Sequence, residues 1–340
     1  MPTSRSDPHL DLLTHIGWNE HLSQSLAALH QPLARAVRIC EQHRSEYRVH
    51  DGARLLKAKP HPALQKQLDD NADGIAVGDW ALIEDNSGGH WITQLLPRTS
   101  LLARGREDGS RQRIAANVDT ALLVMGLDGD FSPQRFERYL LLVRGAQVTP
   151  VVVLTKPDRC ADVSASLHEI RAIAGPVADI HVLDPRTLQA PEALAPYLAT
   201  GQTLVLLGSS GVGKSTLMNT LLGNDGQRTG ATREYDDRGR HTTTSRALRP
   251  LPQGACLIDT PGVRELRLSG EEAVEQDAFE DIQSLAANCR FSDCQHRREP
   301  GCAVTVGVAA ERLARYHKLK DELAASNQAR AGKGPVRNPR

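Results

Sequence analysis

The chain has 340 residues, which is enough for two or three domains that each bury a core of their own. Hydrophobic residues make up 40% and charged residues 24%, and neither a long apolar run nor a secretory pattern occurs, so the sequence predicts a cytoplasmic protein and excludes a membrane span. Basic and acidic residues number 41 each, so no overall charge indicates a nucleic-acid partner.

The first part of the sequence predicts a helical extension followed by a small barrel. Residues 1–32 are typical of a short, partly helical extension, to which we assign no chemistry. Residues 33–114 contain short strands of alternating hydrophobicity between turn residues: RAVRICEQ, YRVHDG, ARLLKAK, GIAVGDWALIED and HWITQLLPR. The strands predict a five-stranded oligonucleotide-binding (OB-fold) barrel, although an SH3-like barrel would show much the same pattern.

The middle of the chain predicts a parallel α/β sheet. In residues 115–272 the pattern changes to apolar runs of strand length, with helical stretches such as PQRFERYLLLVRGA between them. The runs are residues 120–127, 149–155, 179–184, 202–208 and 254–260. Strands that are apolar on both faces and alternate with helices are typical of a doubly wound sheet.

A glycine-rich loop follows the run at 202–208. Residues 208–215 read GSSGVGKS, which matches the phosphate-loop pattern G-x-x-x-x-G-K-[ST], and a helix-compatible stretch comes next. Inward-pointing amides and the helix dipole can enclose a polyphosphate. We expect Lys214 to reach the β- and γ-phosphates and the Ser215 hydroxyl to ligate Mg²⁺. The predicted nucleotide contacts are Gly208, Ser209, Ser210, Gly211, Val212, Gly213, Lys214, Ser215 and Thr216.

A second phosphate contact is predicted at DTPG, which ends the strand GACLI. Asp259 of this motif can hold the Mg²⁺ shell, and the amide of Gly262 can approach the γ-phosphate. The D-x-x-G pattern alone is weak, and its position after a buried strand makes it credible.

A guanine contact is predicted at TKPD, which resembles the motif N-K-x-D. The carboxylate of Asp158 can accept the pair of hydrogen bonds that guanine donates and adenine cannot. Thr155 replaces the asparagine of the motif, so we expect the amide that ties this loop to the phosphate loop to be lost. The predicted contacts are Thr155, Lys156, Pro157 and Asp158.

The order of these motifs is reversed relative to an ordinary GTP-binding domain, in which the phosphate loop comes first. A doubly wound sheet gathers its ligand loops at the carboxyl ends of the strands, so the site tolerates a different chain order. The most specific segments are QRIAANVD, GSSGVGKST, GRHTTT, DTPGVRE and CRFSDCQHRREPGCAV. In these segments the chain resembles the circularly permuted GTPases, and among them the YjeQ/RsgA family of ribosome small-subunit-dependent GTPases.

The resemblance covers about residues 33–325 and implies a GTPase of late small-subunit maturation. It implies slow hydrolysis of GTP to GDP and phosphate, stimulated by the small (30S) ribosomal subunit, with binding to rRNA and release on hydrolysis. It also implies an OB-fold barrel and a C-terminal zinc domain. At the fifth nucleotide motif, where a Ser-Ala pair is usual, the chain has Val182, Leu183 and Asp184. Gly211 occupies the place of an asparagine that recruits K⁺ in some permuted GTPases, so K⁺ dependence is not favoured.

The water-positioning glutamine of Ras-like enzymes is replaced by Val263, which predicts slow intrinsic turnover. The segment GRHTTT lies between the phosphate loop and DTPG, where the first switch belongs. We expect Thr243 to ligate Mg²⁺ and, with the support of the resemblance, His241 to orient the attacking water. The alternative for His241 is an exposed side chain in a mobile loop. Lys214 completes the predicted catalytic set.

Three cysteines and a histidine cluster near the C-terminus: Cys289, Cys294, His296 and Cys302. Three thiolates and an imidazole suit tetrahedral Zn²⁺ and leave no open position, so the predicted role is structural. The surrounding sequence is too polar for a core of reduced cysteines. We predict a mainly helical zinc-binding domain at 273–325 and a basic tail at 326–340 that is either disordered or phosphate-binding.

Because DTPG comes last among the nucleotide motifs, the segment VRELRLSG leads almost directly into the predicted zinc domain. Contacts with the γ-phosphate could therefore reorient a surface that touches RNA. Candidate RNA contacts on the last helix are His317, Lys318 and Lys320.

The leading interpretation is an Mg²⁺-dependent, monomeric GTPase that acts on the small ribosomal subunit and its rRNA, with GTP and GDP as ligands. A second is a nucleotide-gated RNA-binding scaffold in which hydrolysis is incidental. A third, a P-loop ATPase or small-molecule kinase, is disfavoured by TKPD.

Overall fold

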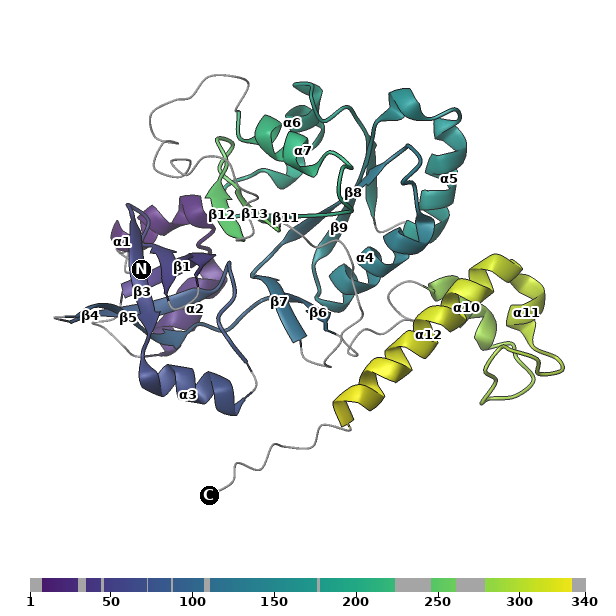
Figure 1. The fold of residues 1–340 in the computed structure, drawn as a ribbon, viewed down its shortest axis with the longest axis horizontal. Coiled ribbons are helices and arrows are strands. Elements are labelled where there is room, and N and C mark those ends of the chain that lie inside the picture. Colours follow the sequence, from purple (N-terminus) through teal and green to yellow (C-terminus); the bar gives the residue numbers. More distant parts are fainter. Residues whose placement is uncertain are drawn as a thin grey trace, which may run out of the picture.

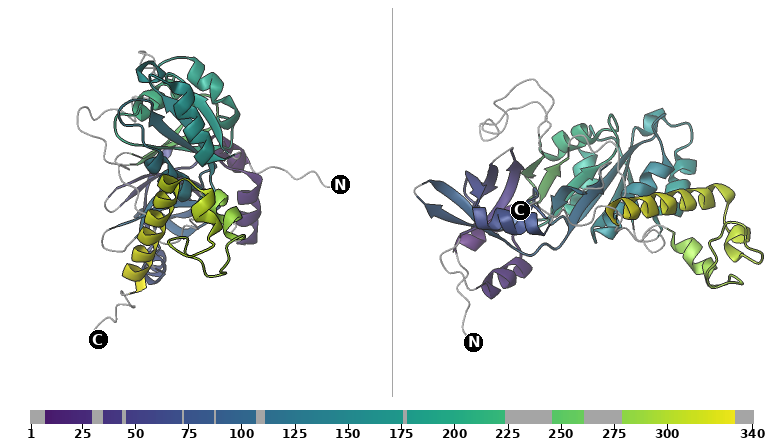
Figure 2. Two further views of the ribbon diagram at one scale, coloured as in Figure 1. Left: turned by 90° about the vertical axis from the view of Figure 1, so that its right-hand side faces the viewer. Right: turned by 60° about the horizontal axis from the view of Figure 1, so that its bottom comes forward.

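The computed structural model describes residues 8–29, 35–43, 46–71, 73–86, 88–106, 111–175, 178–223, 246–260 and 279–331. It consists of a barrel (strands β1 to β5), an α/β domain (β8 to β13) and a C-terminal module (residues 279–331), which follow one another along the longest axis (Figure 1). The right-hand view in Figure 2 also shows the barrel and the C-terminal module at opposite ends of the α/β domain.

The N-terminal strands close into a five-stranded barrel, as predicted. Their bounds are β1 Arg35–Gln42, β2 Tyr47–His50, β3 Leu55–Pro60, β4 Trp80–Asn86 and β5 Gly89–Leu95. The sheet order is β1-β2-β3-β5-β4, and β4 pairs back onto β1, with β3 and β5 parallel. Closure leaves no open edge. Helix α3, Pro62–Asp70, which the sequence analysis does not predict, lies between β3 and β4.

The α/β domain has the predicted parallel sheet. Its strands are β8 Thr120–Gly126, β9 Thr149–Thr155, β10 Asp179–Val182, β11 Thr203–Leu207, β12 Ala247–Pro250 and β13 Cys256–Asp259. The spatial order is β10-β9-β8-β11-β13-β12; the first five are parallel, and β12, which the sequence analysis does not predict, is antiparallel to β13. All carboxyl ends of the parallel strands therefore lie at one rim.

Helices cover both faces of this sheet. They are α4 Pro133–Gly145, α5 Val163–Ala174, α6 Gln189–Ala193 and α7 Lys214–Leu221, with short 3₁₀ helices at Pro157–Arg159 and Ala195–Tyr197. Side chains alternate between the faces of a strand. Accordingly, Val152 and Leu154 of β9 pack in the core that contains α4 and α5, whereas Val151 and Val153 pack in the core that contains α6 and α7. The doubly wound architecture is confirmed.

The N-terminal extension is part of the shared core. It forms α1 Pro8–Leu13, a 3₁₀ helix at Thr14–Ile16 and α2 Glu20–Ala28. Leu13, Ile16 and Trp18 are buried in the core that also contains strands of the α/β domain. The indole of Trp18 meets that of Trp80 edge to face, with 4.8 Å between ring centroids. This segment, to which the sequence suggested no role, therefore packs between the barrel and the α/β domain.

Barrel and α/β domain are also joined through their backbones and one buried arginine. Strand β1 pairs with β12 at Glu41 and Ala247, which makes one sheet of eleven strands. The fully buried Arg38 donates hydrogen bonds to the carbonyls of Ile16 and Asn117 and to the hydroxyl of Thr203. One guanidinium thus binds the N-terminal extension and the α/β domain from within the barrel.

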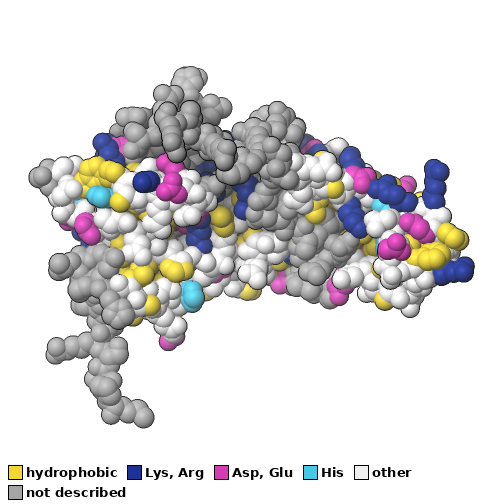
Figure 3. Space-filling model, turned by 90° about the horizontal axis from the view of Figure 1, so that it is seen from below, with side chains coloured by type: hydrophobic (Ala, Val, Ile, Leu, Met, Phe, Trp, Pro, Cys, Tyr) yellow, Lys and Arg dark blue, Asp and Glu magenta, His cyan; other side chains and the backbone are white. Residues whose placement is uncertain are grey.

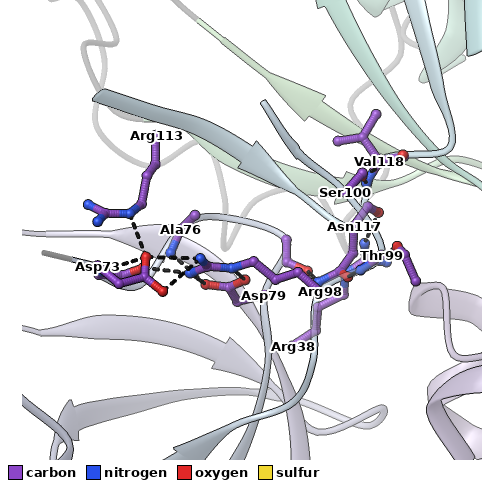
Figure 4. A network of polar contacts seen from close by, with 12 residues as sticks. Arg38, Asp73, Ala76, Asp79, Arg98, Thr99, Ser100, Arg113, Asn117 and Val118 are labelled. Carbon is purple, nitrogen blue, oxygen red and sulfur yellow. Dashed lines mark hydrogen bonds and ion pairs between the residues drawn. The ribbon is translucent and has the colours of Figure 1, made fainter. Parts of the chain in front are cut away.

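Asn117, in the segment QRIAANVD, also helps to connect the barrel to the α/β domain (Figure 4). Its φ of 52° places it in the left-handed region, which asparagine tolerates better than most residues. Its amide donates to the Gly78 carbonyl and accepts from the Thr99 amide, each at 3.0 Å. The side chain therefore fixes the point at which the chain passes from the barrel to strand β8.

A hairpin and a network of ion pairs brace the same region. Strands β6 Leu101–Gly105 and β7 Arg111–Ala116 form a separate two-stranded sheet. Arg98 makes two bonds to Asp79, at 2.6 and 2.8 Å, and also donates to Asp73. Arg113 of β7 donates to Asp73 at 2.9 Å, so the hairpin is tied to the loop that precedes β4.

The C-terminal module is mainly helical, as predicted, with α10 Glu280–Ala286, α11 Ala303–Gly307 and α12 Ala310–Ala331. Its core includes Phe279, Ile282, Tyr316 and Leu319 and is completed by Leu141 of α4. Among the described helices, none is both long and apolar enough to cross a bilayer.

Candidate nucleotide site and metal centre

The phosphate loop connects β11 to α7 at the rim where the parallel strands end. Gly208 and Gly213 have φ values of 154° and 102°, and a Cβ on Gly208 would lie 2.2 Å from the Val124 carbonyl oxygen. Only glycine fits that position. Gly213 precedes the first residue of α7, so the helix N-terminus opens into the loop.

Lys214 lies folded across this loop. Its ammonium donates to the carbonyls of Gly208 and Ser209, at 2.7 and 2.5 Å. Ser210, Gly211 and Ser215 are exposed on the solvent side of the loop. The loop therefore has the strand, turn and helix geometry that an anion-binding site requires. Its lysine lies against the backbone of the same loop.

The tie between the guanine motif and the phosphate loop is present, contrary to our expectation. The fully buried Thr155 hydroxyl donates to the Val212 carbonyl at 2.6 Å and also lies 3.3 Å from the Met125 carbonyl oxygen. The prediction that the link is lost with the asparagine amide was wrong, because the Thr155 hydroxyl makes a hydrogen bond to the phosphate loop itself.

The rest of the guanine motif lies beside β8. Lys156 has a φ of 58°, and its ammonium pairs with Asp128 at 2.6 Å. The hydrogen bond from Lys156 is the main cause that holds the pKa of the Asp128 carboxyl below its usual value. Asp158 is exposed in the short helix Pro157–Arg159. The lysine stem is thus held at the rim and the aspartate is open to solvent.

The loop after β10 packs directly against the phosphate loop. The Thr220 hydroxyl of α7 donates to the Pro185 carbonyl at 2.6 Å, and a Cβ on Gly213 would lie 3.3 Å from the Pro185 ring. The Asp184 carboxylate pairs with Arg186 at 2.6 Å. The atypical fifth motif therefore lies at the site, with its aspartate already engaged by a neighbouring arginine.

Strand β13 brings Asp259 to the same rim. Burial raises the pKa of Asp259, and the charges of Arg249 and Lys214 oppose this shift. The Thr260 hydroxyl donates to the Leu206 carbonyl of β11 at 2.7 Å and fixes the strand end. The predicted contacts His241, Thr243 and Gly262 lie outside the described residues, as does Val263.

Sequence reasoning missed a polar contact beneath the phosphate loop. Arg135 of α4 donates to the Ser209 hydroxyl at 2.9 Å and to the Asp130 carboxylate at 2.8 Å. The Ser209 hydroxyl donates to the same carboxylate. No motif in the sequence signals this contact, because it joins residues 74 positions apart.

The four predicted metal ligands meet in the C-terminal module. The possible ligand atoms of Cys289, Cys294, His296 and Cys302 lie within 4.8 Å of one another. The Cys289 and Cys302 sulfurs are 3.8 Å apart, and the His296 Nδ1 is 3.6 and 3.5 Å from them. Tetrahedral Zn²⁺ with its usual bond lengths places two sulfurs about 3.8 Å apart and sulfur and nitrogen about 3.6 Å apart. The donor set therefore fits this ion.

Residues of the two following helices contact the backbone of His296 and the sulfur of Cys302. His296 has a φ of 59°, and its carbonyl lies 3.0 Å from Nε2 of His317 on α12. The backbone amide of Thr305 donates to the Cys302 sulfur at 3.4 Å. Contacts that orient the ligands are thus supplied by both α11 and α12.

The comparisons with known proteins agree with this geometry. The family model described as RsgA GTPase matches residues 95–269. A curated "Small ribosomal subunit biogenesis GTPase RsgA" from Xanthomonas axonopodis pv. citri (strain 306) is 46% identical and covers 99% of this chain and 97% of its own. The chain belongs to the RsgA GTPase family. A protein of the same name from Xanthomonas campestris pv. campestris (strain B100) is 45% identical, with the same coverage of both chains.

Two solved structures have a similar fold. YjeQ from Thermotoga maritima superposes with a TM-score of 0.61 at 24% identity and covers 86% of this chain and 99% of its own. YloQ, described as a circularly permuted GTPase, gives a TM-score of 0.55 at 22% identity and covers 91% of this chain and 99% of its own. These structures agree with a circularly permuted α/β domain, in which the guanine motif follows β9 and the phosphate loop follows β11. Membership of the RsgA GTPase family makes the chain a GTP hydrolase and implies the use of Mg²⁺.

Proposed function

We propose that this protein hydrolyses GTP during the late maturation of the small ribosomal subunit and that the subunit stimulates the reaction. The observation that carries the proposal is the convergence of three loops at one rim. Thr155 donates a hydrogen bond to the phosphate loop at Val212, and β11, which leads into that loop, pairs with β13, which ends at Asp259. The curated relatives, which are 45 to 46% identical over nearly their whole length, are named as small ribosomal subunit biogenesis GTPases.

In the proposed site each loop has one task. The amides of residues 208–215 enclose the phosphates, with Lys214 at the β- and γ-phosphates. Asp158 accepts hydrogen bonds from guanine, which excludes adenine. Mg²⁺ would be held by Ser215 and Thr243 and would offset charge on the phosphates. Gly262 approaches the γ-phosphate, and His241 orients the attacking water, since Val263 cannot.

We further propose that the C-terminal module holds one structural Zn²⁺ and contacts rRNA together with the barrel. At the end of the molecule farthest from the barrel, the module carries exposed Lys and Arg side chains, with Asp, Glu and hydrophobic side chains among them (Figure 3). Barrel and module flank the α/β domain, so both could touch RNA on either side of the nucleotide (Figure 1). The protein would act as a monomer in the cytoplasm and leave the subunit after hydrolysis.

The decisive experiment measures GTP turnover alone, with purified small subunits and with purified large subunits. We expect stimulation by the small subunit only. The His241→Ala variant should still bind GTP but lose the stimulation. Equal turnover under all three conditions would favour the alternative, an RNA-binding scaffold gated by nucleotide in which hydrolysis is incidental.

A further inference from the structure

A charged pair from the start of α4 touches the phosphate loop. The Arg135 guanidinium donates to the Ser209 hydroxyl and to Asp130, and the Ser209 hydroxyl donates to Asp130 as well. On its other side, the Ser209 carbonyl accepts from Lys214. The second residue of the phosphate loop is therefore held by its hydroxyl and by its carbonyl at the same time.

The Asp130 carboxylate is a negative charge one hydrogen bond away from this loop. The Ser209 hydroxyl first, and the Arg135 guanidinium next, hold the pKa of Asp130 below its usual value, so the carboxylate is charged at neutral pH. Of the other charged groups nearby, Asp128 is already paired with Lys156. Among the described residues, Arg135 is the cation that forms an ion pair with Asp130.

The effect of the Asp130 charge on a bound nucleotide depends on how exposed this ion pair is to solvent. The side chains of Arg135 and Asp130 are 35% and 41% exposed, so solvent screens part of their field. An uncompensated carboxylate beside a polyphosphate would still oppose binding, and more so for the ligand with the larger negative charge. GTP carries one more ionised phosphate than GDP.

We propose that Arg135 is a positioning residue of the phosphate loop, which orients the Ser209 hydroxyl and offsets the charge of Asp130 so that GTP is not disfavoured relative to GDP. The inference rests on the proposed phosphate-binding role of residues 208–215. Arg135 acts on the nucleotide indirectly, through its contacts with Ser209 and Asp130.

The test compares the Kd values of GTP and GDP in five variants of the full chain. Arg135→Gln should raise the Kd of GTP by about threefold to tenfold and the Kd of GDP by a smaller factor. Adding Asp130→Asn to that variant should bring GTP binding back towards the parent, since the opposed charge is then gone. Asp130→Asn alone should leave the affinity for GTP unchanged or raise it.

Arg138→Gln is the matched control, because Arg138 lies on the same helix and pairs with Glu322, away from the loop. This variant should bind both nucleotides like the parent. The inference is overturned if Arg135→Gln lowers both affinities equally, if the double variant stays as weak as the single one, or if Asp130→Asn weakens GTP. The Lys214→Ala variant separates the two proposals, since unchanged GTP binding there would reject the phosphate-loop role itself.

Discussion

Thr155 shows how one atom preserves a link that the sequence suggested was lost. Its hydroxyl is buried and donates to the Val212 carbonyl at 2.6 Å. In Thr155→Ala that carbonyl loses its partner in a buried position, which costs about 1 to 3 kcal/mol. We expect Thr155→Ala to weaken GTP binding by about tenfold, measured by titration with a fluorescent GTP analogue.

Thr155→Ser is the control for this prediction, because it keeps the hydroxyl and removes only a methyl group. It should bind GTP within about threefold of the parent. An alanine variant that binds as tightly as the serine variant would show that the bond does not support the nucleotide site.

The site residues that could be predicted from the sequence are those that lie close together along the chain. The phosphate loop spans eight consecutive positions, from Gly208 to Ser215, and the metal ligands fall between Cys289 and Cys302. The bonds from Thr155 to Val212 and from Arg135 to Ser209 join residues 57 and 74 positions apart. Such contacts depend on the packing of the sheet and leave no local pattern in the chain.

Helix α4 is the element that connects the α/β domain to the C-terminal module. The Glu137 side chain is 1% exposed and pairs with Arg312 at 2.6 Å and with Arg315 at 3.0 Å. The Arg312 guanidinium also lies over the Phe279 ring, 4.1 Å from its centroid. Burial raises the pKa of Glu137, and the charges of Arg315 and Arg312 oppose that shift. A buried carboxylate between two guanidiniums thus anchors α12.

Replacing this carboxylate should loosen the module. In Glu137→Gln the largely buried Arg315 loses its counter-charge, and Arg312 keeps only its pair with the half-exposed Asp281, which together cost about 3 kcal/mol. We expect faster hydrogen exchange in α12 and a lower denaturation midpoint. Glu322→Gln breaks the pair with Arg138, whose side chains are 23% and 26% exposed and so more open to solvent than Glu137, and it should change stability by about 1 kcal/mol or less. Equal rates of hydrogen exchange in α12 of Glu137→Gln and Glu322→Gln would mean that Glu137 does not anchor this helix.

Among the elements, those with strong periodicity could be predicted and those defined by a partner could not. The five barrel strands and the five parallel strands have clear apolar patterns. Strand β12 is four residues long and becomes a strand only because β13 and β1 lie on either side of it. The extension at residues 8–29 has an apolar face, but its binding place between two domains is set by tertiary packing.

For the whole molecule, the metal centre should determine whether one end is folded. Cys302 lies in the core of the C-terminal module, and that core has few large apolar side chains of its own. We expect removal of the metal with a strong chelator to unfold α10 and α11, with a loss of helical circular dichroism. The α/β domain has its own cores, so its affinity for GTP should remain.

The Cys302→Ala variant should reproduce the chelator result and should bind less than one zinc ion per chain. A chelated protein that keeps its full helical signal would show that apolar packing alone holds the module. Loss of GTP binding together with the metal would show that the module and the nucleotide site fold as one unit.

The position of the N-terminal extension has a consequence during synthesis. Its final surroundings include Thr203, which Arg38 joins to Ile16, and Cys256, whose thiol faces the His15 carbonyl. At the usual speed of translation, roughly 10 to 50 s pass between the appearance of the first helices and that of the last of these partners. For that interval the helices of the nascent chain can pack only against the barrel, and their remaining apolar surface must avoid association with other chains until the strands of the α/β domain have been made.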